Sequence, residues 1–331
     1  MALVVTRSGG PEVLEWREVP APEPAAGEIL LRARAFGVQW ADLLEREGRY
    51  PGGPQPPFVA GHDVVGDVVS VGPGVDSPPV GTRVFGAVPR GGAAAELVAV
   101  PASWMHAVPD GVSDETAAAV VSPYFTADAA IITLGRFEPG ETVLVHAAAG
   151  SFGSAAVQLC RAYGASTIVG TAGSDEKLKR VAEFGADVVV NYTTDDFVSA
   201  VLDATDGRGV DLVVESVGGD ILGRCLDCIR PGGRLVSVGA SSGESSKRFR
   251  LQTLFEKGIL VGGFTLGLWV EHEPELVRPS AERVLDLLRR GEIAPVIGAV
   301  FEPTSAADAH RYLENRQSVG RTVISLSPAP Q

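Results

Sequence analysis

A histidine and a carboxylate stand side by side at His62 and Asp63, in a glycine-rich run just before a valine-rich segment. Asp42 adds a second carboxylate upstream. Imidazole and carboxylate are common zinc ligands, and a catalytic zinc takes three protein ligands. These side chains could therefore bind a metal, or His62 could hydrogen-bond locally and bind no ion. The three residues alone leave both interpretations open.

A second chemical pattern is the run Ala148-Ala-Gly150-Ser-Phe-Gly153, which lies between a strand-like segment and a helical segment. Small residues at this spacing allow a tight turn and a close approach to a pyrophosphate, and the helix N-terminus offers free amides. The strand before, the helix after and further strand–helix units favour dinucleotide binding over a simple packing turn. Phe152 departs from the pattern, because a smaller aliphatic side chain would suit the turn better.

The end of the second strand in this region determines which dinucleotide is expected. NAD sites place an acid there against the ribose 2′-hydroxyl, whereas this strand ends in small residues before Gly173 and Ser174. The next acid, Asp175, reads as a first-turn residue of a helix capped by Ser174. An open Gly-Ser pocket, with Lys177 one turn on and Tyr192 at the tip of the next strand, suits a 2′-phosphate. We therefore expect NADPH.

Composition argues against several kinds of partner. The 331-residue chain has a formal charge of −13, so it offers no basic field to nucleic acid or anionic lipid. We see no signal peptide, and the apolar runs read as too short for the roughly 20 residues that span a bilayer. Three cysteines, Cys160, Cys225 and Cys228, argue against a disulfide framework and for a cytoplasmic protein. Cys225 and Cys228 are predicted to pack in the core.

Two contrasting sequence patterns predict the structural elements that position these residues. Residues 1–117 read as short β segments separated by Gly/Pro turns, which predicts a mostly β, barrel-like lobe. Residues 118–263 alternate apolar strands with helical periods, which predicts a doubly wound parallel sheet. Residues 264–331 hold two helices and a closing strand, too little to fold alone, and are predicted to complete the first lobe.

The chain resembles the medium-chain dehydrogenase/reductase superfamily, and within it the zinc-independent NADPH:quinone oxidoreductases of the ζ-crystallin-like branch. The resemblance rests on "GRYPGGPQPPFVAGHDVVGDVVSVGPGV", "HAAAGSFGSAAVQLCRAYGA", "GVDLVVESVGGD", "PGGRLVSVG" and a closing "GRTV", which follow the family order over almost the whole chain. It implies an α/β fold class: a GroES-like β-barrel catalytic domain plus a doubly wound parallel Rossmann domain.

The resemblance also bears on the metal question. Zinc-dependent relatives have cysteine where this chain has Gln39 and Ser122, and histidine where it has His62. Both thiolate ligands of a catalytic zinc are therefore missing. We expect no metal, while a set of His62, Asp63 and Asp42 is the alternative that the residues leave open.

Without a metal, the negative charge that hydride transfer creates on a substrate needs a hydrogen-bond donor. By the resemblance, Gln39 replaces the family's asparagine, whose amide faces the substrate oxygen. Tyr50 matches the proton donor of related enoyl-thioester reductases, with a cleft-wall aromatic as its alternative role. Asp42 would orient either group or cap a helix. The predicted catalytic residues are Tyr50, Gln39 and Asp42.

The resemblance implies further cofactor contacts along the nicotinamide and its ribose. The full set of predicted cofactor-binding residues is Thr126, Ala148, Gly150, Ser151, Phe152, Gly153, Gly173, Ser174, Lys177, Tyr192, Val238, Gly239, Ala240, Ser241, Phe264, Thr265 and Leu266.

The activity expected from this resemblance is NADPH-dependent, zinc-independent hydride transfer to a quinone or an α,β-unsaturated carbonyl. An enoyl-thioester reductase of a biosynthetic pathway is the enzymatic alternative. A non-enzymatic NADPH-binding protein is the alternative of another class. The apolar stretch "GILVGGFTLGLWV" is expected to pair between two subunits as strand, as in the family, so the chain is predicted to be a homodimer.

Overall fold

The structure, a computed structural model, describes residues 1–244, 246 and 249–326. It divides into two compact units. The first comprises residues 1–122, 270–272 and 295–331, and the second comprises residues 123–269 and 273–294. The first unit thus resumes fully at Pro295, whereas the sequence analysis let it resume at residue 264.

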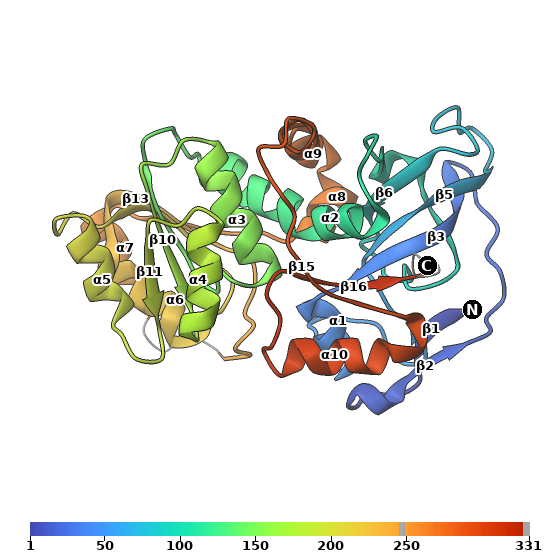
Figure 1. Ribbon diagram of the computed structural model, residues 1–331, viewed down its shortest axis with the longest axis horizontal. Helices are drawn as coiled ribbons and strands as arrows, with labels where there is room; N and C mark the ends of the chain where they lie inside the picture. Colours follow the sequence, from blue (N-terminus) through green and yellow to red (C-terminus); the bar gives the residue numbers. More distant parts are fainter. Residues whose placement is uncertain (245, 247–248, 327–331) are drawn as a thin grey trace. The chain divides into compact units, whose positions relative to one another are not determined.

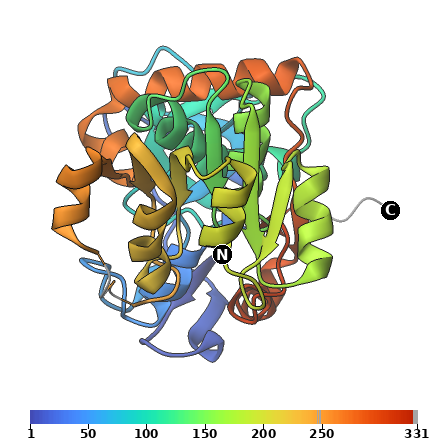
Figure 2. The same ribbon diagram turned by 90° about the vertical axis from the view of Figure 1, so that its left-hand side faces the viewer.

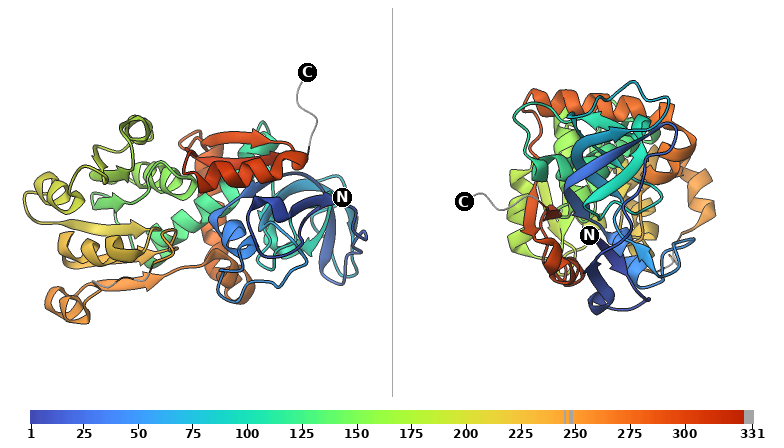
Figure 3. Two further views of the ribbon diagram at one scale, coloured as in Figure 1. Left: turned by 90° about the horizontal axis from the view of Figure 1, so that it is seen from below. Right: turned by 90° about the vertical axis from the view of Figure 1, so that its right-hand side faces the viewer.

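Two β-sheets form the first unit (Figure 1). A three-stranded sheet has the order β2-β1-β4, and a larger one has the order β15-β16-β3-β5-β6-β8, with β7 also paired to β3. All strand pairs of these sheets are antiparallel except β15 with β16. The first strand of the chain, β1, and the last, β16, both belong to this unit (Figure 3). The strands are β1 (Ala2–Val5), β2 (Leu14–Arg17), β3 (Glu28–Val38), β4 (Phe58–Val59), β5 (Asp63–Val71), β6 (Arg83–Ala87), β7 (Leu97–Pro101), β8 (Met105–Ala107), β15 (Ile297–Phe301) and β16 (Arg321–Ser325).

Apolar residues that alternate along these strands build the core of the first unit. In β3 they include Ile29 and Leu31, both fully buried, as the period of two along a strand requires. Two helices lie beside the sheets, α1 (Trp40–Arg46) directly after β3 and α10 (Ala306–Glu314) before β16. Single 3₁₀ turns occur at Pro11–Val13, Ala102–Trp104 and Pro303–Ser305.

The second unit is a six-stranded parallel sheet of order β11-β10-β9-β12-β13-β14, with helices on both faces (Figure 2). The doubly wound sheet predicted from the sequence is therefore confirmed. Its strands are β9 (Thr142–Val145), β10 (Thr167–Ala172), β11 (Val188–Asn191), β12 (Val210–Glu215), β13 (Ile229–Ser237) and β14 (Leu260–Gly263). Its helices are α3 (Ser151–Ala162), α4 (Asp175–Glu183), α5 (Phe197–Ala204), α6 (Gly219–Cys228), α7 (Leu251–Lys257), α8 (Leu266–His272, whose last three residues cluster with the first unit) and α9 (Pro274–Arg289).

The apolar stretch of residues 258–270, which the sequence analysis expected to be strand, is strand only in part. Only Leu260–Gly263 is strand, and the chain turns into α8 at Leu266. The strand β14 lies at an edge of the sheet, and Leu260 and Val261 on it are 58% and 40% exposed.

One helical stretch, Asp114–Leu134, is long and apolar enough to cross a membrane, which the sequence analysis did not expect. It comprises α2 (Asp114–Asp128) and a π-helical segment (Ala129–Leu134). Its most apolar window has a mean hydropathy of 1.5 and is 72% buried inside the structure. The core helix of a soluble protein passes the same test, so the finding is weak support for a membrane span.

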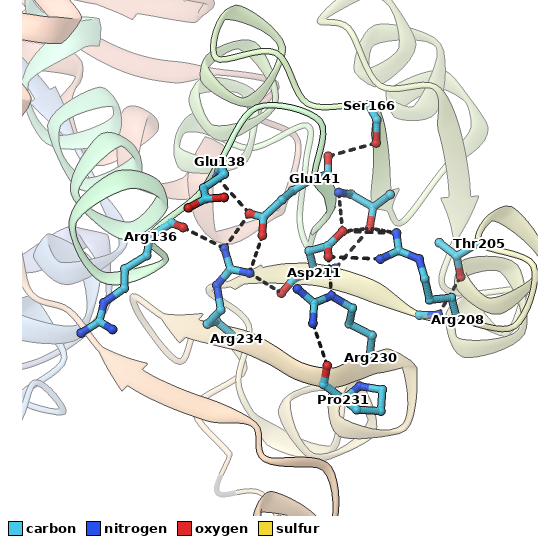
Figure 4. A network of polar contacts seen from close by, with 12 residues as sticks. Arg136, Glu138, Glu141, Ser166, Thr205, Arg208, Asp211, Arg230, Pro231 and Arg234 are labelled. Carbon is cyan, nitrogen blue, oxygen red and sulfur yellow. Dashed lines mark hydrogen bonds and ion pairs between the residues drawn. The ribbon is translucent and has the colours of Figure 1, made fainter.

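A polar network closes the amino end of the parallel sheet (Figure 4). Asp211, at the start of β12, accepts from the Thr142 backbone at 2.8 Å and contacts Arg230. Burial opposes the charge of this carboxylate, but the bonds from Thr142 and Arg230 outweigh it and lower the pKa of Asp211. Arg234 bridges Glu141 and the Asp211 backbone. This network fixes strand ends, and the candidate cofactor residues follow the opposite ends.

Candidate functional site

The helix α1 positions the polar candidates of the first unit. Gln39 is the N-cap of this helix, and the carboxylate of Asp42, the N3 residue, accepts from the Gln39 backbone N–H at 2.8 Å in a capping box. The sequence analysis allowed Asp42 either to orient Gln39 or Tyr50 or to cap a helix, and the structure shows a capping contact. Glu45 follows one turn later, and residues three apart lie on one helix face. Both carboxylates are buried, at 4% and 5% exposure.

His62 completes a compact acidic cluster with this helix. Its Nε2 lies 2.9 Å from Glu45 Oε2 and 4.0 Å from Asp42 Oδ1. Burial lowers the pKa of His62, but the bond to Glu45 and the charge of Asp42 outweigh it and raise the pKa to about 9. Burial raises the pKa of Asp42 to about 6, against the charge of His62. Asp42 Oδ1 has no hydrogen-bond partner.

Asp63 lies outside this cluster because its oxygens are already engaged. It accepts from the Gly37 backbone N–H at 2.7 Å and from Ser122 Oγ at 2.8 Å, and it pairs with the buried guanidinium of Arg321. A Cβ on Gly37 would lie 2.1 Å from that guanidinium, so a larger residue here would displace Arg321 from Asp63. The alternative metal set of His62, Asp63 and Asp42 is therefore not the one that the structure assembles.

Arg46 anchors α1 at its other end. Its guanidinium is 1% exposed, donates to the Gly9 carbonyl at 3.0 Å, lies 3.3 Å from His310 Nδ1 and pairs with Glu314 on α10. Burial and the charge of Arg46 lower the pKa of His310 to about 3, so a neutral imidazole faces the guanidinium. The sequence analysis missed Arg46, because its partners are distant in the chain.

Tyr50 lies in the loop after α1 and is partly buried. Its N–H donates to the Leu44 carbonyl at 3.1 Å, and its own carbonyl accepts from Gly53 at 3.0 Å. A Cβ on Gly53 would meet both Tyr50 and the Glu45 side chain, so Tyr50 adjoins the acidic cluster. Burial and the charge of Glu45 raise the pKa of Tyr50. The three substrate candidates, Tyr50, Gln39 and Asp42, therefore all belong to the first unit.

The cofactor candidates belong to the second unit, where most follow the carboxyl ends of its parallel strands. That edge, at the point where the strand order reverses between β9 and β12, is where ligands bind in doubly wound sheets. Gly150 is the N-cap of α3. A Cβ on Gly153 would lie 2.3 Å from the Ala147 carbonyl oxygen, so the close helix–strand contact requires glycine. The buried Ser151 Oγ has no hydrogen-bond partner.

The expected 2′-phosphate region is assembled from two strand ends. The Tyr192 hydroxyl lies 2.6 Å from where a Cβ on Gly173 would be, so these two residues adjoin. Ser174 caps α4 by accepting from the Lys177 N–H at 3.4 Å, as predicted. Asn191 donates to the Asp175 carboxylate at 2.8 Å, which ties that acid to β11.

All but one of the remaining cofactor candidates follow β13 and β14. Buried Glu215 accepts from the Gly218 N–H at 2.7 Å and so shapes the adjacent loop. The Val238 N–H donates to the Glu215 carbonyl, and that of Ser241 to the Ser216 carbonyl, beside Gly239 and Ala240. Phe264 and Thr265 lead into α8, which begins at Leu266, and Thr126 lies on α2.

The cysteine pair packs in the core, as predicted. Cys225 and Cys228 are fully buried and unpaired, and Cys225 Sγ lies 3.3 Å from His146 Nε2. Burial, with a smaller effect of Arg224, lowers the pKa of His146 to about 3. Burial raises the pKa of both thiols, so neither is a reactive thiolate.

Two family models match this chain, one in each of its two units. Residues 25–110 match the alcohol dehydrogenase GroES-like domain, and residues 152–282 match the zinc-binding dehydrogenase family. A quinone oxidoreductase of Pseudomonas aeruginosa is 37% identical over 96% of each chain. A 2-haloacrylate reductase of Burkholderia sp is 33% identical over 98% of each chain. The crystal structure of the Escherichia coli quinone oxidoreductase complexed with NADPH has a TM-score of 0.91 at 31% identity and covers 98% of this chain and 99% of its own.

The zinc that the name of the second matched family implies does not fit the residues present here. Gln39 and Ser122 stand in place of thiolates, and Ser122 and Asp63 bond to each other. The dinucleotide edge, by contrast, fits its group, with a partnerless serine hydroxyl and a glycine cradle. With a GroES-like first domain, a parallel six-stranded Rossmann sheet and relatives matched over nearly the whole chain, the protein belongs to the medium-chain dehydrogenase/reductase superfamily, in its quinone oxidoreductase branch.

Proposed function

We propose that this chain is an NADPH-dependent reductase that acts on a quinone or an α,β-unsaturated carbonyl without the zinc of its zinc-dependent relatives. The observation that carries the proposal is the loss of both cysteine positions, to Gln39 and Ser122, in a chain that keeps the parallel sheet and the glycine turn between β9 and α3. Charge on the substrate must then be met by neutral donors. Tyr50 supplies a phenol and Gln39 an amide.

The cofactor supplies the hydride when bound, and the second unit supplies its recognition. Ser151 and the α3 N-terminus would hold the diphosphate. Gly173, Ser174 and Tyr192 would surround the adenosine ribose, with no acid at the tip of β10. Because Asp175 is bonded to Asn191, the pocket favours a 2′-phosphate over a hydroxyl that needs a carboxylate partner.

Lys177→Ala should weaken NADPH binding by about tenfold or more and leave NADH binding nearly unchanged, because a charge-assisted contact contributes roughly 1.5–3 kcal/mol. Lys179→Ala is the matched control, since Lys179 is an exposed lysine on the same helix. Fluorescence titration of the unaltered protein and both variants with each cofactor measures these affinities. Equal affinity of the unaltered protein for NADPH and NADH would refute the assignment.

NADPH oxidation with 1,4-benzoquinone, 9,10-phenanthrenequinone and crotonyl-CoA in parallel tests the proposed reaction. Turnover of a quinone supports the proposal. Turnover of crotonyl-CoA alone would identify an enoyl-thioester reductase instead, a role that Tyr50 also suits. NADPH binding without turnover of any acceptor would indicate a non-enzymatic NADPH-binding protein.

We propose that two copies pair through β14, whose apolar edge is otherwise an aggregation hazard. Light scattering should then give twice the 34.4 kDa mass of the chain. Val261→Asp should shift the protein to monomers, whereas Val300→Asp, at an exposed valine of the first unit, should not. A stable monomer of the unaltered protein at micromolar concentration would contradict this assembly. A cytoplasmic location is part of the proposal, and three buried, unpaired cysteines support it.

A further inference from the structure

Glu215 places a fully buried carboxylate at the carboxyl end of β12. One of its oxygens accepts from the Val217 and Gly218 backbone N–H groups, the latter at 2.7 Å, and the other accepts from Ser237 Oγ at 3.3 Å. Because both oxygens accept hydrogen bonds, neither needs to carry a proton. In the part of the chain that the structure describes, this carboxylate forms no ion pair.

The neighbouring side chains leave the charge of Glu215 uncompensated. Burial above all, with the charge of Glu215 as a smaller cause, raises the pKa of the Cys225 thiol on α6. His146, 3.3 Å from that thiol, is neutral because burial lowers its pKa to about 3. Arg224 on the same helix pairs with Asp196. A glutamine could make equivalent hydrogen bonds without the free-energy cost of a buried charge, so the charge itself calls for an explanation.

The position of Glu215 in the sheet supplies one. The glycine turn and the expected 2′-phosphate region follow β9 and β10, so the adenosine half of a dinucleotide belongs to β9-β10-β11 and the nicotinamide half to β12-β13-β14. Glu215 joins the loops after β12 and β13, since Ser237 Oγ also lies 3.3 Å from the Gly239 carbonyl. A Cβ on Gly218 would lie 3.0 Å from that of Ala240, so the two loops adjoin above this carboxylate.

We infer that the buried charge of Glu215 stabilises the oxidised, positively charged nicotinamide over the reduced, neutral one, and so makes bound NADPH a stronger hydride donor. The inference rests on the proposed NADPH-dependent function. Loss of a hydride leaves the nicotinamide ring with a positive charge, and a fixed charge in a water-excluded site acts on it strongly. At an effective dielectric constant of about 20, two unit charges about 10 Å apart change an equilibrium constant by about tenfold.

Separate titrations of the protein with NADP⁺ and with NADPH test the inference without any acceptor. Glu215→Gln keeps the hydrogen bonds but removes the charge, so the ratio of the NADP⁺ Kd to the NADPH Kd should rise about tenfold, which is about 30 mV for a two-electron couple. Glu215→Asp keeps the charge and should hold the ratio within about threefold. Asp227→Asn, at an exposed carboxylate near the carboxyl end of α6, is the control and should leave the ratio unchanged.

The pH dependence of the same ratio in the unaltered protein provides a second measurement, which stands even if Glu215→Gln does not fold. Burial raises the pKa of Glu215 against the hydrogen bonds from the Gly218 and Val217 N–H groups. As the pH falls through this raised pKa, the carboxylate becomes neutral and its attraction for NADP⁺ is lost, so the ratio should rise. Asp220 and Glu244, the other acids of these loops, are exposed, so water and salt screen their charges.

The outcomes separate this inference from the proposed function. If Glu215→Gln weakens both cofactors equally, or if the ratio in the unaltered protein does not change with pH, Glu215 only shapes the loops and the inference falls, while the proposed function stands. A protein that binds neither NADPH nor NADP⁺ would overturn both. A tenfold rise found with NAD⁺ and NADH instead would support the inference and overturn the cofactor assignment.

Discussion

Replacing Tyr50 by phenylalanine should lower enone turnover by about 30- to 1,000-fold and leave NADPH affinity nearly unchanged. Removing one preorganised donor costs on the order of 2–4 kcal/mol at the barrier. Tyr50 is suited to this role because burial and the nearby charge of Glu45 raise its pKa above the ordinary phenol value. The phenol therefore stays protonated at neutral pH and can donate as negative charge develops on the substrate.

Tyr312→Phe is the matched control for this substitution. It removes the same hydroxyl from α10, where the ring packs near Phe301, 5.9 Å between ring centroids. Steady-state kinetics with one enone and a cofactor titration separate turnover from binding. His62→Ala should have a modest effect on turnover. If it abolishes turnover while Tyr50→Phe stays near the unaltered rate, the role assigned to Tyr50 is wrong.

The second unit could be predicted in detail because its signals are local. Alternating apolar strands and helical periods gave the parallel sheet, and the cap of α4 by Ser174 follows from neighbours in the chain. The need for glycine at position 153 is likewise a contact between adjacent segments. In such units the chain order itself determines which residues reach the carboxyl edge of the sheet.

The polar cluster of the first unit could be predicted only in part, because its contacts join distant segments. Asp42 and His62 were recognised as candidates, but Asp63 was grouped with them on adjacency alone. Its partner Arg321 lies 258 residues away in the sequence, and no local pattern indicates that contact. Glu45 carried one usable signal, since it stands three residues after Asp42 on a helix and so shares its face.

The Asp63–Arg321 pair predicts the largest effect on stability. Asp63→Asn keeps the shape of the side chain but removes the charge opposite a guanidinium that is 3% exposed. Breaking one side of a buried pair costs about 3–5 kcal/mol, because the remaining charge has no counter-charge and no water. Urea unfolding followed by tryptophan fluorescence measures this effect. Trp16, Trp40 and Trp104 all lie in the first unit, so the signal reports mainly on it.

Asp67→Asn provides the comparison that isolates burial. Asp67 lies on the same strand, β5, and pairs with Arg34 at 3.0 Å, but these side chains are 32% and 40% exposed. An exposed pair contributes only about 0–1 kcal/mol, so this variant should unfold close to the unaltered protein. Combining Asp63→Asn with Arg321→Gln should recover part of the loss, because both charges are then gone. Equal shifts for Asp63→Asn and Asp67→Asn would show that the buried pair does not stabilise the first unit in the way its geometry implies.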